Sequence, residues 1–315
     1  MTAIRIEGLQ KTYGSVRALD GLTLSVPEGA IFGFLGPNGA GKTTTIRLLT
    51  GLAHPSGGQA WVADTPIAES RKVARRIGYL PEEPASYTWM TPLEFLDHVG
   101  RLFGLSAAER KARSMELLEK AGLTQSRKRR IAGFSRGMRQ RLGLAQALIN
   151  RPEVLFLDEP VSALDPAGRK EVLEMIEGLR GQCTVFMSSH ILADIERVCD
   201  TVGIINQGKL IVEANQQQLL ERYVQPIFEL ECSGNGMESF KAWVAELKSK
   251  PWVRSISMEG PVARVTVRDT DIAEHTLLSD VASQVFTLRR YEIVRPSLED
   301  VFLLLVNGNG QEVKS

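Results

Sequence analysis

Eight residues near the start of the chain, Gly36 to Thr43 with the sequence GPNGAGKT, have the spacing of a phosphate-binding loop. They fit the pattern G-x-x-x-x-G-K-[ST], whose backbone N–H groups surround nucleotide phosphates. In this pattern Lys42 reaches the β- and γ-phosphate oxygens, and Thr43 ligates Mg²⁺. The pattern should arise by chance in on the order of one chain in a hundred of this length. We therefore expect a nucleoside triphosphate here rather than a glycine-rich turn without chemical function. The residues expected to bind it are Gly36, Asn38, Gly39, Gly41, Lys42, Thr43 and Thr44.

Two acidic residues follow an apolar run later in the chain. Val154 to Leu157 are four apolar residues typical of a central strand, and Asp158 and Glu159 come directly after them. Ligands of open parallel sheets bind at the carboxyl ends of the strands. Asp158 is therefore expected to hold Mg²⁺, directly or through water, and Glu159 to polarise the attacking water. A solvated acidic turn is the alternative, which the phosphate loop upstream disfavours.

Two further positions suit nucleotide binding, although each also has a purely structural interpretation. Ser135 can cap a helix, and Gly137 leaves backbone N–H groups open to an anion. Alone, this would be an ordinary helix start. Tyr13 offers a flat apolar ring on which an adenine can stack, but a tyrosine considered alone is more often a core or surface residue.

The elements around these residues are those that the chemistry requires. Ala30–Leu35 is typical of a short buried strand and Thr43–Leu52 of a helix. Strand, glycine loop and helix is the order in which a phosphate loop is built. Thr91 and Glu94 form a capping box, and from there the pattern is mostly helical. We predict an α/β core that is interrupted by a helical block at about residues 90–150.

Composition limits the partners of this chain of 315 residues, which is long enough for two domains. The 38 Lys and Arg residues nearly balance the 37 Asp and Glu residues, so no basic footprint for nucleic acid is expected. Three scattered cysteines are interpreted as reduced thiols of a cytosolic protein. The first seven residues do not resemble a signal peptide, and no apolar run approaches the ~20 residues that a membrane span needs.

Past residue 215 the pattern of the sequence changes. We place a linker at residues 216–225, a small α+β domain at 226–306 and a tail at 307–315. Apolar residues from Phe228 to Cys232 alternate with glutamates as in a strand with one wet face, and Phe240–Leu247 has the period of an amphipathic helix. The predicted order is β-α-β-β-α-β, with the last strand at about residues 285–294. Because this domain contains no catalytic constellation, we expect it to have a regulatory or dimer-stabilising role.

Over roughly residues 3 to 215, the chain resembles the nucleotide-binding subunit of ATP-binding-cassette (ABC) transporters. Six landmarks occur in the order that this family has, which makes a coincidence very improbable. They are Tyr13 as the adenine-stacking aromatic, Gly36–Thr43 as the Walker A loop, Ser135–Met138 as the signature, Val154–Glu159 as Walker B, Ser162–Asp165 as the D-loop and Ser188–His190 as the switch region. The resemblance implies a P-loop NTPase core of the ABC ATPase type at residues 1–215, with an inserted helical subdomain.

The resemblance also implies ATP and Mg²⁺ as cofactors and a mechanism. Two subunits, either two copies of this chain or this chain and a related cassette, would face head to tail. The loop of one subunit and the Ser135 helix start of the other would then clamp one ATP. Glu159 would activate water, while Lys42, Mg²⁺ and His190 would stabilise the charge on the γ-phosphate. Asp165 would communicate across the interface and is also a good helix N-cap.

Two departures from the usual family pattern refine this expectation. Glu82 stands where the family usually carries a glutamine that contacts Mg²⁺ and water, which places a further carboxylate at the metal. Arg136 and Met138 replace the usual glycine and glutamine of the signature. The resulting Ser-[Lys/Arg]-Gly-Met resembles the exporter branch, whose membrane partner is a separate six-helix permease of the ABC-2 type.

We therefore expect an ATPase subunit that powers export through a separate integral-membrane permease, bound peripherally at the cytoplasmic face of the cell membrane. The main alternative is a soluble cassette ATPase that acts as a mechanical switch on a non-membrane partner. Such relatives usually carry two cassettes, long coiled coils or basic extensions, and this chain has one cassette and a net charge of +1. A regulator that uses hydrolysis as a timer is a third possibility. The cargo is not encoded in these residues, because the membrane partner selects it.

Overall fold

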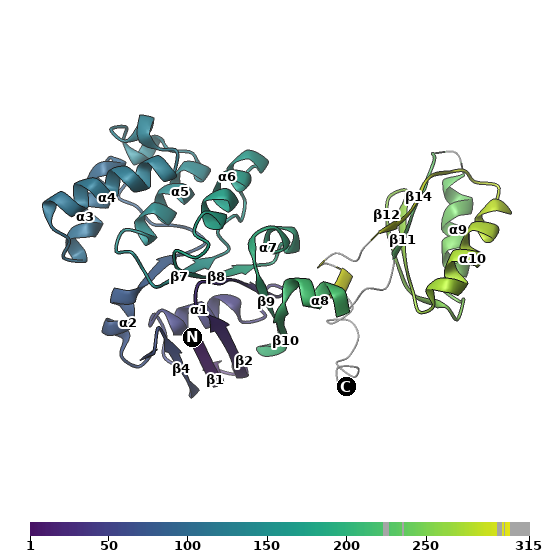
Figure 1. Ribbon diagram of the computed structural model, residues 1–315, viewed down its shortest axis with the longest axis horizontal. Helices are drawn as coiled ribbons and strands as arrows, with labels where there is room; N and C mark the ends of the chain where they lie inside the picture. The colour runs from purple at the N-terminus through teal and green to yellow at the C-terminus, as the bar shows by residue number, and fades with distance from the viewer. Residues whose placement is uncertain (223–226, 235, 295–297, 299, 303–315) are drawn as a thin grey trace. The chain divides into compact units, whose positions relative to one another are not determined.

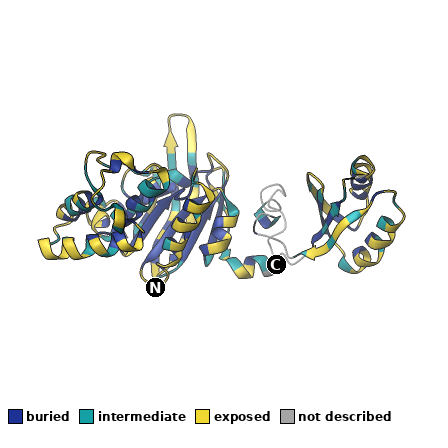
Figure 2. Cartoon of the chain, turned by 90° about the horizontal axis from the view of Figure 1, so that it is seen from above, coloured by how far each residue is buried: buried dark blue, intermediate teal, exposed yellow. Residues whose placement is uncertain are grey.

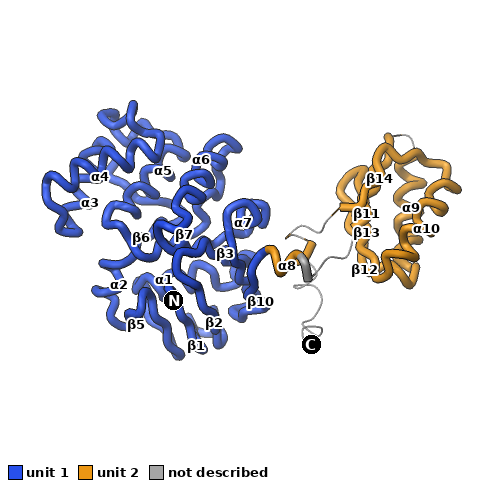
Figure 3. The backbone as a smooth tube through the Cα atoms, viewed as in Figure 1, with its two compact units in different colours: residues 1–216, 308–315 blue, residues 217–307 orange. Residues whose placement is uncertain are grey.

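The computed structural model describes residues 1–222, 227–234, 236–294, 298 and 300–302. The chain divides into two compact units, one at residues 1–216 and the other at 217–307, which Figure 3 shows in blue and orange. The predicted tail at residues 307–315 lies outside the described residues. Among the described helices, none combines the length and the apolar character needed to cross a bilayer.

The first unit is built on a six-stranded sheet in which five neighbouring strands are parallel (Figure 1). In spatial order the strands are β10 (Lys209–Asn215), β9 (Thr201–Asn206), β3 (Ile31–Leu35), β8 (Thr184–Ser189), β7 (Val154–Asp158) and β6 (Ile77–Leu80). Strands β3, β7 and β8 are buried along their whole length, which explains their near-continuous apolar sequences. Phe32 and Phe186 stack between β3 and β8 with ring centroids 5.3 Å apart.

An antiparallel sheet lies beside this central sheet and shares its core. In spatial order its strands are β2 (Val16–Pro27), β1 (Thr2–Tyr13), β4 (Gly57–Val62) and β5 (Thr65–Pro66). Ile4, Ile6 and Leu24 alternate with exposed residues, and they pack in one hydrophobic cluster with Phe34 and Phe156 of the central sheet. Strands β1 and β2 therefore each have one buried face and one exposed face.

A block of helices is inserted between β6 and β7, which pair in parallel although more than 70 residues separate them. The inserted helices are α3 (Pro92–Leu102), α4 (Ala107–Lys120) and α5 (Arg136–Ala147), with short 3-10 turns η1 (Thr124–Ser126) and η2 (Ile131–Gly133) between the last two. Thr91 and Glu94 form the predicted capping box at the start of α3. Ser106 and Glu109 form a second one at the start of α4.

The first unit also contains the helices α1 (Lys42–Leu49), α2 (Ser70–Arg76), α6 (Pro166–Glu177) and α7 (Leu192–Val198). In Figure 2 the strands of the central sheet are dark blue and the outer faces of the helices are yellow, so the core lies between the sheet and the helices that cover it. Asp165 caps α6 by accepting a hydrogen bond from the backbone N–H of Gly168, as its position before Pro166 predicts.

The second unit has the predicted order β-α-β-β-α-β. Its elements are β11 (Ile227–Cys232), α9 (Met237–Leu247), β12 (Val253–Glu259), β13 (Val262–Val267), α10 (Thr270–Ala282) and β14 (Leu288–Val294). The strands form an antiparallel sheet in the order β12-β13-β11-β14, and both helices lie on one face of it (Figure 1). Phe228, Phe240, Trp243 and Phe286 are buried in the core between them.

Two element boundaries differ from the sequence-based prediction. A helix, α8 (Gln216–Arg222), occupies most of the expected linker, and its start is held because the Gln216 backbone N–H donates to the Asp200 carbonyl. The last strand was expected from residue 285 but begins at Leu288. Phe286 lies in a bend before it, with its ring buried edge-on against Phe240 at 5.1 Å, whereas the neighbouring Val285 is exposed.

Candidate active site

The phosphate loop connects β3 to α1, so the predicted order of strand, loop and helix is present. Close packing requires two of its glycines. A Cβ at Gly36 would lie 2.4 Å from the Ile205 carbonyl oxygen, and a Cβ at Gly41 would lie 2.8 Å from the Ala18 carbonyl oxygen. Gly41 also has φ of 113°, which other residues rarely adopt. The loop therefore approaches neighbouring backbone so closely that no side chain fits at these two positions.

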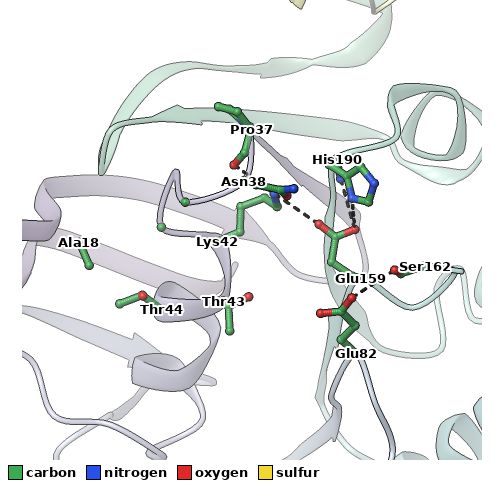
Figure 4. A pocket seen from close by; sticks show the side chains of 12 residues that line it. Ala18, Pro37, Asn38, Lys42, Thr43, Thr44, Glu82, Glu159, Ser162 and His190 are labelled. Carbon is green, nitrogen blue, oxygen red and sulfur yellow. Dashed lines mark hydrogen bonds and ion pairs between the residues drawn. The ribbon is translucent and has the colours of Figure 1, made fainter. Parts of the chain in front are cut away.

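Lys42 is the first residue of α1 and is almost completely buried, at 6% exposure. Its ammonium group donates to the carbonyl oxygen of Gly36 at 2.7 Å and forms an ion pair with Glu159, with 3.3 Å between Nζ and Oε1. A buried charge of this kind is stable only with such partners. The pair joins the phosphate loop to the end of β7, as Figure 4 shows.

Ser188 of β8 connects the two acidic residues at the end of β7. Its hydroxyl donates to Asp158 Oδ1 at 2.7 Å and accepts the backbone N–H of Glu159 at 3.0 Å. The backbone turns sharply at Glu159, whose φ of 48° lies in the left-handed region that glutamate rarely adopts. The hydrogen bond from the Glu159 N–H to Ser188 helps to hold this turn. Asp158 thus stays hydrogen-bonded to Thr43 of the loop, while the Glu159 side chain turns toward Lys42 (Figure 4).

The other oxygen of Glu159 is bound by His190, which follows β8. Glu159 Oε2 lies 2.8 Å from His190 Nδ1 and also accepts the His190 backbone N–H at 3.3 Å. Below this pair, the Ser162 hydroxyl donates to Glu82 Oε1 at 3.1 Å (Figure 4). One glutamate is therefore shared between a lysine and a histidine, and a second glutamate is held beside it.

These side chains border one open cavity of about 490 Å³. Figure 4 shows the loop residues on one side of it and Glu159, His190, Ser162 and Glu82 on the other. The lining residues are Ala18, Pro37, Asn38, Gly39, Gly41, Lys42, Thr43, Thr44, Glu82, Glu159, Ser162 and His190. Nine of these twelve were predicted from the sequence as site residues, and the cavity brings together segments that lie more than 100 residues apart.

The donor set of the cavity fits a magnesium ion that is held jointly with a phosphate. The Thr43 hydroxyl donates to Asp158 Oδ1 at 3.1 Å, so two hard oxygen ligands are adjacent. Burial raises the pKa of Asp158, and its hydrogen bonds from Ser188 and Thr43 oppose this effect. In the described part of the chain, no three His, Cys, Asp or Glu residues gather into a metal site by themselves. Mg²⁺ commonly binds one or two protein ligands and completes its shell with substrate phosphates and water.

Five predicted site residues do not line the cavity: Tyr13, Gly36, Ser135, Gly137 and Asp158. Asp158 lies beneath the loop, and Gly36 contributes its carbonyl to Lys42. Tyr13 is 46% exposed, with the Lys11 ammonium 4.6 Å above its ring centroid. Ser135 caps α5 by accepting the Met138 backbone N–H, and Gly137 lies in the first turn of that helix. Ser135 and Gly137 therefore lie outside this cavity, although Arg136 of the signature lines a neighbouring pocket together with Glu82.

Four residues of the site were not predicted as site residues: Ala18, Pro37, Ser162 and Ser188. Pro37 lies inside the loop pattern, and Ser162 and Ser188 lie in segments whose resemblance to the family was recognised, so the signal for these three was available. Ala18 is in β2 and has no chemical group that the sequence could have drawn attention to. It reaches the cavity only because β2 packs beside the loop.

Comparison with known proteins identifies a family whose model spans the phosphate loop and the acidic end of β7. The family model described as ABC transporter matches residues 19–162. The chain is 41% identical over 305 residues to the uncharacterised ABC transporter ATP-binding protein YxlF of Bacillus subtilis, which covers 97% of this chain and 100% of that protein. It is 34% identical to the daunorubicin resistance ATP-binding protein DrrA2 of Streptomyces coeruleorubidus, covering 99% of this chain and 98% of that protein. A solved structure of an ATP-binding subunit of an ABC transporter superposes with a TM-score of 0.64 at 29% identity, covering 70% of this chain and 93% of that one.

Proposed function

Since the chain belongs to the ABC transporter ATP-binding subunits and has their ATPase domain, we propose that it hydrolyses ATP to drive export through a separate membrane permease of the ABC-2 type. The observation that carries the catalytic part is the position of Glu159, whose two carboxylate oxygens contact Lys42 and His190 at the rim of the phosphate loop. This arrangement supplies a phosphate-binding cation, a base for water and a third polar group in one cavity.

Binding of ATP would begin with an exchange of partners at Lys42. The ammonium group is paired with Glu159, and a triphosphate in the loop offers it oxygen atoms of higher negative charge. The loop amides and the start of α1 add donors to the same phosphates. When Lys42 turns to phosphate, Glu159 Oε1 loses its cation and becomes available to a water molecule. Nucleotide binding thereby prepares the base.

Hydrolysis would then use the remaining contacts of Glu159. His190 holds Glu159 Oε2, which orients the carboxylate while Oε1 accepts the proton of the attacking water. Thr43 and Asp158 would hold Mg²⁺, and Glu82 would contact it or its water; the ion would neutralise charge on the β- and γ-phosphates. Lys42 and His190 would stabilise the charge that develops on the γ-phosphate.

Two cassettes would act together, because the signature lies away from the cavity that holds the loop. Ser135 and Gly137 at the start of α5 present backbone N–H groups that suit the γ-phosphate of an ATP on a second subunit. The second subunit would be another copy of this chain or a related cassette. Loss of the γ-phosphate would remove that shared ligand and release the pair. Tyr13 would stack on the adenine, as its exposed ring allows.

Export is supported by the branch of the family that the chain resembles. One of the relatives that match it over nearly the whole length is named for daunorubicin resistance. The signature Ser135-Arg-Gly-Met138 has the form of the exporter branch with a separate permease. We place the protein peripherally at the cytoplasmic face of the cell membrane. The antiparallel unit at residues 217–307 would regulate turnover or stabilise the pair of cassettes.

The deciding experiment is the isolation of the protein from native membranes with its partners. We would tag the chain, extract it gently in the presence of ATP, and identify what co-purifies. A membrane protein with about six apolar spans at near-equal stoichiometry is expected. The variant Lys42→Ala serves as the matched control. It should lose ATP hydrolysis but still co-purify with the same partner. Recovery of a non-membrane partner, such as ribosomal material, would instead support a soluble mechanical switch.

A further inference from the structure

Two surface segments of the helical subdomain lie side by side. Residues 87–90 precede α3, and residues 127–132 precede α5. The Ile131 backbone N–H donates to the Met90 carbonyl and that of Ala132 to the Thr88 carbonyl, both at 2.9 Å. Arg130 Nη1 adds a third bond to the Trp89 carbonyl at 2.6 Å. These bonds fix the side chains of both segments on one continuous stretch of surface.

The first segment contributes exposed aromatic rings. Tyr87 is 49% exposed and Trp89 is 61% exposed, and their ring centroids are 5.8 Å apart. Tyr87 is also packed edge-on against Phe95 and His98 of α3, so the pair has a fixed base. A large exposed indole is costly in water, and neighbouring exposed aromatic residues indicate a contact surface.

The second segment contributes four consecutive cations, Arg127 to Arg130, and the last three are exposed. None of the four forms an ion pair with a carboxylate of the described residues, whereas most other cations of the inserted helices do. Arg127 and Arg129 donate to backbone carbonyls. The nearby Glu94 is already occupied as the acceptor in the Thr91 capping box. Glu94 also attracts Arg130 electrostatically, but no carboxylate of the described residues forms an ion pair with Lys128 or Arg129, so most of the positive charge of this segment is not neutralised.

Trp and Tyr side chains next to Lys and Arg are the residues that proteins use at the boundary between a bilayer and water. The rings enter the headgroup region, and the cations attract anionic lipid. We propose that this aromatic-basic patch, formed by Tyr87, Trp89, Lys128, Arg129 and Arg130, binds the anionic surface of a phospholipid bilayer directly. The contact does not require the permease and goes beyond the proposed ATPase and transport function.

A bilayer suits this patch better than an acidic protein does. Mobile headgroups can neutralise a run of cations without matching the geometry of each one, and no deep pocket is needed. Nucleic acid is disfavoured, because the net charge of the whole chain is only +1. The acidic protein remains as an outcome of the test.

Trp89 supplies a built-in reporter for this test. Trp243 and Trp252 are at most 8% exposed, and Trp61 is partly buried with the Arg5 guanidinium 3.9 Å above its ring. We would mix the full chain with vesicles of phosphatidylglycerol and, separately, phosphatidylcholine, without any permease. We expect sedimentation and a blue shift of tryptophan emission with phosphatidylglycerol only, and weaker binding at 0.5 M salt. Trp89→Phe should abolish the shift while most of the binding remains.

Lys128→Glu/Arg129→Glu tests the cations, with Arg71→Glu/Arg75→Glu on α2 as the control. Both variants change the net charge equally, at exposed positions that form no ion pair with a carboxylate of the described residues, and ATPase activity reports that each is folded. At roughly fivefold per cation removed, the patch variant should bind phosphatidylglycerol at least about 25-fold more weakly than the control variant. Equal loss in both variants, no loss in the patch variant, or no binding to pure lipid while permease-containing membranes bind, would each overturn the proposal.

Discussion

Replacement of Glu159 by Gln tests the catalytic assignment most directly, because the amide keeps the shape of the side chain and removes its charge. In the structure, Oε1 lies 3.3 Å from the Lys42 ammonium and Oε2 lies 2.8 Å from His190 Nδ1. An amide in this position can still bond to His190 but cannot accept a proton from water. The variant therefore separates positioning from base catalysis.

The magnitude of the effect follows from these contacts. A positioned general base contributes about 10²- to 10⁴-fold to a rate, so kcat should fall by that factor. At 1.36 kcal/mol per tenfold, this fall corresponds to a rise of about 2.7–5.4 kcal/mol in the activation free energy. ATP affinity should be retained or rise by up to about tenfold. The reason is that Lys42 keeps its bond to the Gly36 carbonyl but no longer has to leave a buried ion pair when phosphate binds.

The assay would measure phosphate release in single turnovers, ATP affinity with a fluorescent nucleotide, and the oligomeric state in the presence of ATP. We expect slow release, unimpaired binding and a persistent dimer. Glu83→Gln is the matched control, because it makes the same chemical change next to Glu82 without lining the cavity. If Glu159→Gln hydrolyses ATP within about threefold of the wild-type rate, Glu159 is not the base and the argument from its position is wrong.

Three further predictions follow from other contacts. Glu82→Gln should raise the Mg²⁺ concentration for half-maximal hydrolysis by about two- to tenfold through loss of a charge that Ser162 positions; an unchanged Mg²⁺ titration would remove Glu82 from the metal site. Asp97→Asn should lower stability by about 1 kcal/mol at pH 7, because Arg110 and Arg101 hold the pKa of this partly exposed carboxyl below its usual value. The stabilisation is present above the unfolded-state pKa of Asp97 and is lost as the pH falls. In urea unfolding, the difference in free energy of unfolding between the wild type and the variant should therefore shrink below about pH 4. A difference that stays constant with pH would contradict the assignment. Deletion of residues 226–315 should leave nucleotide binding intact but alter dimerisation or coupled turnover, and unchanged behaviour in both measurements would exclude the proposed role of the second unit.

Most of the local structure was predictable because it depends on short-range patterns. The capping box at Thr91 and Glu94, the N-cap at Asp165 and the buried strand Val154–Asp158 each follow from residues within a few positions of one another. The boundaries that differed have tertiary causes. Phe286 leaves the last strand of the second unit because the ring packs against Phe240 and Trp243, partners more than 40 residues away.

The sequence by itself determined which residue types can bind a triphosphate, since the phosphate loop and the acidic strand end are each contiguous motifs. Only the tertiary structure decided how they meet. Strands β3, β8 and β7 are neighbours in the sheet although they are far apart in the chain, and this order brings Thr43 to Asp158 and His190 to Glu159. The sharing of Glu159 between Lys42 and His190, and the Ser188 hydroxyl that holds the turn, depend on that strand order. Strand order is set by the packing of the whole core, which no local pattern encodes.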